Sequence, residues 1–263
     1  MGRPIAGAVL RSSPISARLL SQLRVRQLKR AGATGELRAF AKYCRRGTVA
    51  VDVGASVGVF TLAASNAVGR HGHVYALEPN PQVFSELINT SWGTRITALN
   101  IAASNHRGNA TFAVPLDSKG SQSPPLGSLE IRPASQSDEF IVRTILLDDI
   151  VPPTSEVSAI KIDVEGHELR VMEGAIETIE RCHPALVVEI EERHLTDTSV
   201  HRVVEWTRSL GYDVWGISGL RMVPWSDFDL YEWQGKWLDG DSITDQTRYV
   251  NNFLFLPAKS ARR

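Results

Sequence analysis

The feature that most limits the fold is a regular alternation of short apolar runs with segments of helical spacing, which begins near residue 48. The apolar runs are rich in Val, Ile and Ala, which is typical of parallel strands covered on both faces. They occupy residues 49–53, 73–78, 159–164 and 185–190. The alternation predicts an α/β fold with a doubly wound, mostly parallel sheet and helices on both faces.

Four helices are expected between and after these strands. Apolar residues at helical spacing predict them near 60–67, 81–88, 169–179 and 200–210. Gly69 and Gly211 are placed to end the first and the last of them. Asn80 is placed to cap the second helix, and Pro81 to occupy its first position.

The composition is that of a soluble globular protein. The chain has 263 residues, of which 43% are hydrophobic and 22% are charged, close to the average for such proteins. Disordered, collagen-like and disulfide-scaffold chains are therefore excluded, and no apolar run approaches the roughly 18 residues of a membrane span. Cys44 and Cys182 lack a metal-binding spacing. We expect a cytoplasmic protein without stable membrane insertion.

Basic residues are concentrated at the start of the chain. Seven of the 29 basic residues, and no acidic residue, lie in residues 1–35, so the rest of the chain is mildly acidic. We expect a basic helical extension over 1–45 and one domain over 46–258. The apolar side of the extension would hold Leu19, Leu20, Leu23 and Leu28. A mitochondrial transit peptide and docking on anionic lipid stay open for it. The acidic body argues against a nucleic-acid partner, and the oligomeric state is left open.

Two segments interrupt the alternation. Residues 115–138 are rich in Ser, Gly and Pro and are interpreted as a long surface loop that could close over a ligand. Residues 206–237 hold five of the six tryptophans. These form either an aromatic wall on the acceptor side of a binding site or the packing of the last strands of the sheet.

A glycine turn follows the first strand, in the run VDVGASVGVF at 51–60. Gly54 is placed to let the backbone turn tightly and approach a ligand, and Gly58 to let the next helix pack on the strand. Open α/β sheets bind ligands beyond the carboxyl ends of their strands, so Asp52 is expected at the floor of a pocket. A carboxylate there suits an ammonium or sulfonium ligand and repels a pyrophosphate. Ser56 occupies the place of the second glycine of the dinucleotide-binding GxGxxG pattern.

The next strand ends in Glu78, 24 residues after Gly54. An acid at this place can accept hydrogen bonds from both hydroxyl groups of a ribose. Each signal alone is weak, but the two in this order predict a nucleoside-binding site.

A further acidic segment, IKIDVEGHE at 160–168, ends the third strand. Because side chains alternate along a strand, Asp163 and Glu165 are expected to point the same way, toward the pocket. They could bind a ligand or take a proton, or Glu165 could cap the following helix.

Six blocks of the sequence resemble the FkbM-type S-adenosylmethionine-dependent methyltransferases. They read VDVGASVGVFTLA, ALEPNP, NIAAS, TILLDDI, IKIDVEGHELRVMEGA and PALVVEIEE, in this order across residues 48–192. The first block is common to methyltransferases in general, whereas DVEGHE followed by a helix ending near EGA is far more specific. The resemblance implies a Rossmann-like class I methyltransferase fold. Its seven-stranded, mostly parallel sheet would have an antiparallel last strand near 251–256.

The resemblance also implies a cofactor site and a reaction. Asp52, Gly54, Ala55 and Gly58 would surround the methionine part of S-adenosylmethionine, Glu78 and Pro79 its ribose, Ala102 or Ala103 its adenine, and Asp163 its methyl group. The implied reaction is methyl transfer to a hydroxyl of a small metabolite, such as a sugar or polyketide. Because the sulfonium is already activated, the protein mainly aligns donor and acceptor and removes one proton.

The residue that takes this proton is left open. His167 is the first choice because histidine titrates near neutral pH, and Asp163 or Glu165 could orient it. Asp163 competes with it, and His194 ranks third. Some methyltransferases of this architecture use a divalent cation, for which Asp163 and Glu165 could supply oxygen ligands, but two carboxylates alone do not establish a metal site.

Two other functions are open from the residues. A nicotinamide-dependent oxidoreductase would need GxGxxG and a Tyr/Lys or His catalytic set, neither of which is found. A non-catalytic nucleoside-binding protein would keep the pocket and need no base.

Overall fold

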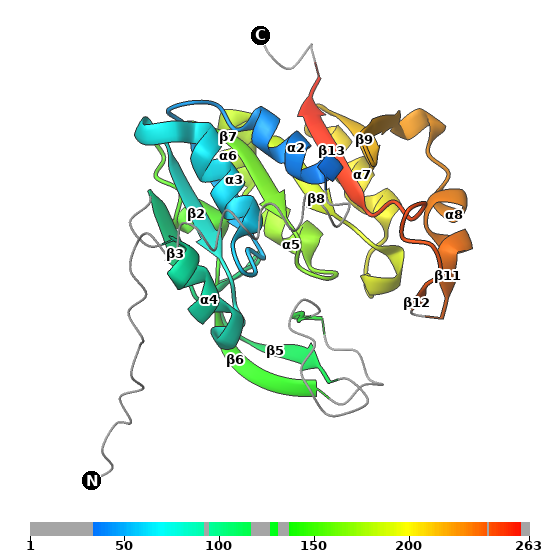
Figure 1. The fold of residues 1–263 in the computed structure, drawn as a ribbon, viewed down its shortest axis with the longest axis horizontal. Coiled ribbons are helices and arrows are strands. Elements are labelled where there is room, and N and C mark those ends of the chain that lie inside the picture. Colours follow the sequence, from blue (N-terminus) through cyan, green and yellow to red (C-terminus); the bar gives the residue numbers. More distant parts are fainter. Residues whose placement is uncertain (1–33, 92–94, 117–126, 131–136, 241, 259–263) are drawn as a thin grey trace.

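A large eight-stranded sheet forms the centre of the molecule (Figure 1). The computed structural model describes residues 34–91, 95–116, 127–130, 137–240 and 242–258. The strands of the sheet are β1 (Val49–Val53), β2 (His73–Leu77), β3 (Ile96–Leu99), β7 (Val157–Ile162), β8 (Ala185–Glu189), β9 (Tyr212–Ser218), β10 (Arg221–Pro224) and β13 (Asn252–Pro257). Every residue of β1 and β7 is buried, which explains their apolar sequences.

The order of the strands is β10-β9-β13-β8-β7-β1-β2-β3. Neighbouring strands from β8 to β3 are parallel, and β13 runs antiparallel to both β8 and β9. The predicted Rossmann-like sheet with an antiparallel last strand is confirmed. It has one strand more than the seven implied, because the chain turns back at Gly219 and β10 pairs antiparallel with the edge strand β9.

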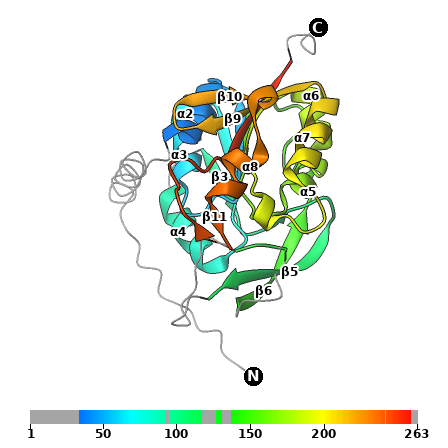
Figure 2. The ribbon, with the colours of Figure 1, turned by 90° about the vertical axis from the view of Figure 1, so that its right-hand side faces the viewer.

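Helices cover both faces of the sheet, as the view along its edge shows (Figure 2). One face carries α2 (Thr34–Tyr43), α3 (Val59–Val68) and α4 (Pro81–Ser91), and the other carries α5 (Glu168–Glu173), α6 (Ile176–Cys182) and α7 (Val200–Ser209). Phe40 of α2 is fully buried in a cluster with Ala50 and Ala64. Helix α2 is thus packed on the domain, although the sequence placed it in the extension. The extension's predicted apolar side lies outside the described residues.

The helix ends follow the predicted signals. Gly69 and Gly211 have positive φ angles of 69° and 83° after α3 and α7, and Asn80 Oδ1 accepts a hydrogen bond from the Gln82 N–H at 2.9 Å. The single helix expected near 169–179 is instead two helices. The backbone N–H groups that begin α6 are satisfied by Asp148, which accepts bonds from Glu177 and Thr178, so a side chain distant in sequence caps a new helix there.

A small sheet stands beside the large one, with strand order β4-β6-β5. Its strands are β4 (Ala102–Ala103), β5 (Gly108–Pro115) and β6 (Ser137–Ile145), and the β5–β6 ribbon projects from the body (Figure 1). The predicted loop at 115–138 connects this ribbon, and its residues 117–126 and 131–136 lie outside the described residues. Residues 127–130 return to the domain, where Ser128 forms a bridge with Ala113.

The tryptophan-rich region contributes to packing near β9 and β13. It contains α8 (Leu230–Trp233), β11 (Leu238–Asp239) and, just after it, β12 (Ser242–Ile243). The ring of Phe228 stacks on Trp225, with ring centroids 5.3 Å apart, and on Trp233, with ring centroids 5.7 Å apart. Phe228 also contacts Phe253 of β13. None of the described helices is long and apolar enough to cross a membrane.

Gly54, between β1 and α3, has a positive φ of 75°. A Cβ added there would lie 1.8 Å from the carbonyl oxygen of Asp163, at the end of the neighbouring strand β7. The sequence predicts a glycine here so that the backbone can turn tightly and approach a ligand. The structure adds a second reason, because the backbone at the end of β7 leaves no room for a side chain.

We expect Gly54→Ala to be clearly more destabilising than Gly47→Ala. Gly47 also has a positive φ, of 80°, but its added Cβ would meet nothing within 4 Å, so it reports only the backbone strain of roughly 1–2 kcal/mol. The overlap at Gly54 should add about 1–3 kcal/mol. Urea denaturation of both variants measures the difference, and equal losses of unfolding free energy would show that the contact with Asp163 is unimportant.

Candidate functional site

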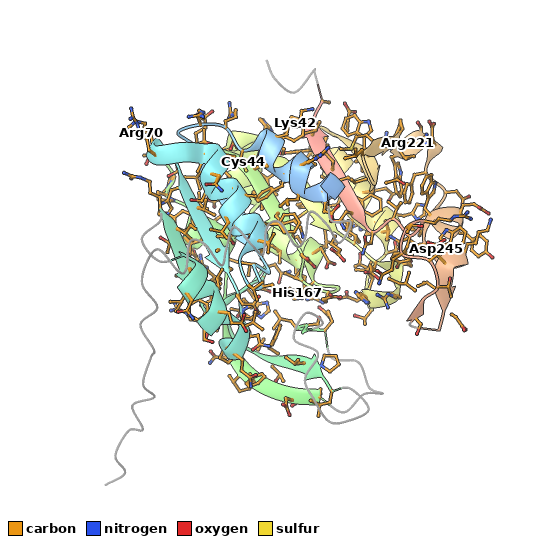
Figure 3. The ribbon with its side chains drawn as sticks, in the orientation of Figure 1. Lys42, Cys44, Arg70, His167, Arg221 and Asp245 are labelled. Carbon is orange, nitrogen blue, oxygen red and sulfur yellow. The ribbon has the colours of Figure 1, made fainter. Side chains whose placement is uncertain are left out.

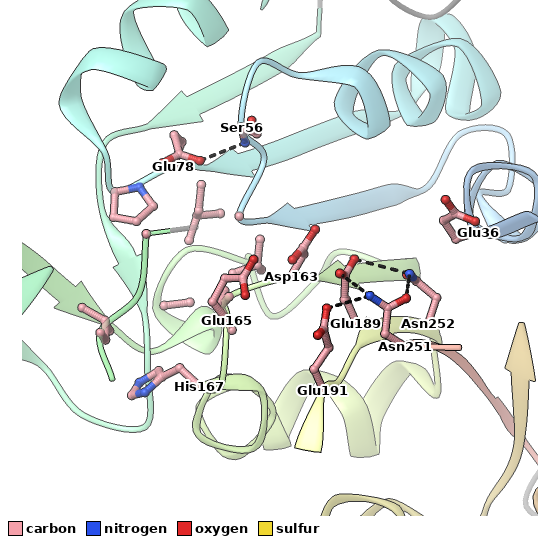
Figure 4. Close-up of a pocket in the computed structure, with 18 of the residues that line it drawn as sticks. Glu36, Ser56, Glu78, Asp163, Glu165, His167, Glu189, Glu191, Asn251 and Asn252 are labelled. Carbon is pink, nitrogen blue, oxygen red and sulfur yellow. Dashed lines mark hydrogen bonds between the residues drawn. The ribbon is translucent and has the colours of Figure 1, made fainter. Parts of the chain in front are cut away.

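A cavity of about 760 Å³ lies at the carboxyl ends of β1, β2, β7 and β8 (Figure 4). Its described lining comes from the β1–α3 turn, the end of β2, the connection to β4, the β7–α5 loop, the end of β8 and the start of β13. Open α/β sheets bind ligands at this edge because the strand ends and loops converge there. The structure therefore brings the predicted site segments to one cavity.

Glu78 is fixed at the β2 end of this cavity. Its Oε2 accepts a hydrogen bond from the Ser56 N–H at 2.9 Å, and its Oε1 accepts one from the Asn80 N–H at 2.8 Å. Only 6% of the residue is exposed, and this burial raises the pKa of Glu78 to about 7. A direct hydrogen bond thus joins the glycine turn to Glu78, and both line the cavity.

Apolar side chains form the cavity wall beyond Glu78. Ala102 and Ala103, which the resemblance places at an adenine, line the cavity together with Ile101, Phe112 and Leu129. Pro79 also lines it. This part of the wall is therefore mostly apolar.

Three residues predicted to contact a cofactor do not line the described cavity: Asp52, Ala55 and Gly58. Asp52 is buried, and its Oδ2 accepts a hydrogen bond from Thr61 Oγ1 of α3 at 2.5 Å. Burial raises its pKa to about 6. Because side chains alternate along β1, Asp52 faces helix α3, which corrects the expectation that it forms the pocket floor.

Lys161 is a buried cation under the cavity that the sequence analysis missed. Lys161 on β7 pairs in register with Asp52 on the adjacent strand β1. Its Nζ lies 3.1 Å from Asp163 Oδ2 and 4.9 Å from the ring centroid of Phe60. Burial lowers the pKa of Lys161, but the charges of Asp163, Glu189 and Asp52 outweigh it and leave the pKa raised. A lysine inside an apolar strand was the signal that could have revealed it.

Asp163 and Glu165 both line the cavity from the loop after β7. Glu165 has a left-handed backbone, with φ 55°, and its Oε2 lies 2.5 Å from His194 Nδ1. Ser128 Oγ donates a hydrogen bond to the Glu165 carbonyl at 2.7 Å. The alternative role of Glu165 as a helix cap is not seen, because the N-cap residue of α5 is His167 and no side-chain cap hydrogen bond is present there.

His167 lies between the large sheet and the β5–β6 ribbon (Figure 3). Its Nδ1 is 2.7 Å from Glu130 Oε1 and its Nε2 is 2.9 Å from Ser104 Oγ. The expected orientation by Asp163 or Glu165 is therefore replaced by partners that the sequence analysis did not name. His167 lines the cavity, but both of its ring nitrogens already have partners.

The far wall of the cavity is a hydrogen-bonded network that sequence analysis also missed. Asn251 Nδ2 donates to Glu189 Oε1 at 2.7 Å and to Glu191 Oε1 at 2.8 Å. The Tyr249 hydroxyl donates to Glu191 Oε2 at 3.0 Å, and Arg193 pairs with the same carboxylate. The acids at the end of the apolar strand β8 were the available signal. Their asparagine partners follow only from the pairing of β13 with β8.

Within the described ranges, no group of three or more His, Cys, Asp or Glu side chains is arranged to hold a metal ion. The tryptophans likewise do not contribute to the described lining of the cavity.

The family model named Methyltransferase FkbM domain matches residues 52–214, which include the glycine turn, Glu78 and the acidic loop after β7. The chain belongs to the FkbM methyltransferase family. This membership and the strand order together give it a Rossmann-like class I methyltransferase fold.

Among proteins similar to this FkbM family member is the hexuronic acid methyltransferase AglP of Haloferax volcanii, with 27% identity over 173 residues. The match covers 64% of this chain and 65% of that relative, so it spans less than two thirds of the relative's length. The crystal structure of an FkbM methyltransferase from Methylobacillus flagellatus has 18% identity and a TM-score of 0.49, over 80% of this chain and 44% of that one. An S-adenosylmethionine-dependent O-methyltransferase from Thermotoga maritima has 12% identity and a TM-score of 0.41, over 96% and 68%.

The buried Glu168, at the start of α5, allows a test of how burial affects the pKa of an acid beside the cavity. Burial raises its pKa from 4.5 to about 8, so between these pH values the folded protein keeps a proton that the unfolded chain has released. The contribution of Glu168 to stability is therefore full below about pH 4.5 and falls as the pH rises toward 8. In Glu168→Gln this loss is absent. We therefore expect the difference in unfolding free energy, variant minus wild type, to rise by more than about 1 kcal/mol when the pH is raised from 5 to 8.

Urea denaturation at several pH values measures this gain. Glu180→Gln, at an exposed position of α6, is the matched control and should retain the pH dependence of the wild type. Parallel pH profiles for Glu168→Gln and the wild type would contradict the raised pKa.

Proposed function

We propose that the protein is an S-adenosylmethionine-dependent O-methyltransferase that methylates a hydroxyl group of a small metabolite, with a sugar as the favoured type. The observation that carries the proposal is the buried Glu78 carboxylate, which faces the cavity with each oxygen held by one backbone N–H. A nearby relative named for a hexuronic acid supports a sugar-like acceptor. We further propose a cytoplasmic location and no nucleic-acid partner.

The residues present fit the donor. Glu78 has further lone pairs on both oxygens with which it would accept bonds from the ribose hydroxyls, and Ala102 with Ile101 would border the adenine. Asp163 would face the cationic methionine end. When bound, S-adenosylmethionine supplies a methyl group that is already activated for transfer, so the protein chiefly has to align an acceptor and accept its proton.

The charge of the cavity favours this donor over a nicotinamide dinucleotide. Carboxylates of Glu78, Asp163 and Glu165 all line it, which would repel a pyrophosphate and attract a sulfonium or ammonium group. Ser56 also carries a side chain where a dinucleotide site has a glycine. The oxidoreductase alternative therefore has little support.

Glu165 is the residue that we assign as the proton acceptor. Its carboxylate lines the cavity, and its contact with the buried His194 fixes its orientation. A left-handed backbone at a non-glycine residue is strained by about 1–3 kcal/mol and is common at functional sites. In the reaction the acceptor oxygen bonds to the methyl carbon, the carbon–sulfur bond breaks, and the hydroxyl proton passes to Glu165. We do not assign His167 as the base, because Glu130 and Ser104 contact its two ring nitrogens.

The donor site is tested with Glu78→Gln. The amide replaces one acceptor oxygen with a donor, which removes charge-assisted bonds to the ribose, so affinity for S-adenosylmethionine should fall by about 10- to 100-fold. Isothermal titration calorimetry measures the affinity, with Glu180→Gln as a control that should match the wild type. Failure of the wild-type protein to bind S-adenosylmethionine or S-adenosylhomocysteine would refute the proposed function.

The assigned base is tested with Glu165→Gln and His167→Gln. Loss of a general base typically lowers the rate by about 10²- to 10⁴-fold, so Glu165→Gln should lower kcat strongly while its affinity for S-adenosylmethionine changes little. Mass-spectrometric detection of a methylated product, with a panel of alcohol acceptors, gives the rates. A larger loss of kcat in His167→Gln than in Glu165→Gln would reverse the assignment. A non-catalytic binding protein would bind the donor and show no transfer with any acceptor.

A further inference from the structure

The cavity extends well beyond the residues assigned to the donor. In Figure 4, Glu78 lies on one side of Asp163, and a group of four residues lies on the other. We call Glu189, Glu191, Asn251 and Asn252 the acceptor wall, and all four line the cavity. Because the donor residues occupy the Glu78 side, the acceptor wall is the surface that an acceptor molecule would contact.

The acceptor wall contains two acids, Glu189 and Glu191, whose pKa values are shifted in opposite directions. Burial raises the pKa of Glu189 well above its usual value, and the nearby charge of Asp163 raises it further. Burial also acts to raise the pKa of Glu191, but the hydrogen bond from Arg193 and the charge of His194 outweigh it and leave the pKa lowered. The two neighbouring acids therefore differ in environment: Glu191 is paired with Arg193, whereas the groups that contact Glu189 are the amides of Asn251 and Asn252.

Cations balance only part of the acidic charge around the cavity. Among the described residues that line the cavity, Arg193 is the only Lys or Arg, and its guanidinium pairs with Glu191. Lys161 is buried beneath Asp163 rather than in the lining. Glu36 of α2 adds a further carboxylate at the far end of the cavity. An additional anion bound here would meet repulsion in a partly desolvated site.

The hydrogen-bonding capacity of the acceptor wall is also one-sided. Both N–H bonds of Asn251 point to carboxylates, and those of Asn252 point to Glu189 and to Asn251 Oδ1. Asn252 Oδ1 is buried without a hydrogen-bond partner among the described residues. The capacity left over is therefore that of acceptor oxygens, which pair with hydroxyl or ammonium donors.

We propose that the acceptor is a hydroxyl-rich molecule without a net negative charge, either neutral or carrying an amine, that the acceptor wall binds by accepting its hydrogen bonds. The inference rests on the proposed function, since it names the acceptor class of that same site. The proposed acceptor class differs from the compound for which the relative AglP is named, because a hexuronic acid carries a carboxylate.

Matched sugars test the charge preference. Methyl glucoside, glucosamine and glucuronic acid share a ring and differ in being neutral, cationic and anionic. We expect methyl glucoside and glucosamine to raise the melting temperature of the full-length protein saturated with S-adenosylhomocysteine at millimolar concentrations, and glucuronic acid to leave it unchanged. The same three sugars are then compared in release of S-adenosylhomocysteine from S-adenosylmethionine.

The variant Glu191→Gln tests whether the acceptor wall causes the preference between charged sugars. Removing one negative charge at short range should reduce the discrimination between glucosamine and glucuronic acid on the order of tenfold. Glu180→Gln, remote on α6, should behave as the wild type.

The outcomes separate the two proposals. If the protein does not bind S-adenosylhomocysteine, the proposed function fails. If it binds S-adenosylhomocysteine and glucuronic acid stabilises it as much as methyl glucoside does, the proposed acceptor class is wrong while the proposed function stands. The acceptor class is also wrong if none of the three sugars binds, or if Glu191→Gln leaves the discrimination unchanged.

Discussion

The site depends on one buried cation, Lys161, beneath a cavity lined by carboxylates. Its Nζ is 3.1 Å from Asp163, and its charge also acts on Asp52 and Glu189. Burying several acids at the end of a sheet is unfavourable unless a cation is placed among them. Lys161 offsets part of this repulsion from below and leaves the cavity side acidic. The same arrangement therefore stabilises the buried acids and gives the cavity the acidic lining on which the proposed preference for cationic groups rests.

The loop after β7 connects this charged floor to the rest of the site. At its start, the Asp163 carbonyl fixes the geometry of the glycine turn at Gly54. In its middle, Glu165 contacts both His194 and Ser128. Three other parts of the chain thus meet on one short, strained loop. Strain of this kind persists only where the surrounding contacts determine the backbone, and these contacts hold Glu165 at the cavity.

Much of the fold was accessible from sequence because its signals are local. The apolar runs, Gly69, Gly211 and the Asn80 cap depend on residues a few positions apart, and the structure confirms them. Glu78 was found because an acid at a fixed distance from a glycine turn implies a place on the sheet edge. Asp52 was misplaced because its side chain points from a face of β1 and packs under α3, so it does not reach the carboxyl edge of the sheet.

The sequence by itself determined the α/β alternation, the family and the acids that reach the carboxyl edge of the sheet. Only the tertiary structure decided which partner each charged group obtained: Glu130 rather than Glu165 for His167, Glu165 for His194, and Asn251 for the acids of β8. The physical reason is that periodicity and capping act over a few residues, whereas these pairs join segments far apart in the chain. Their choice is set by sheet pairing and loop packing, and with it the charge and hydrogen-bonding character of the pocket.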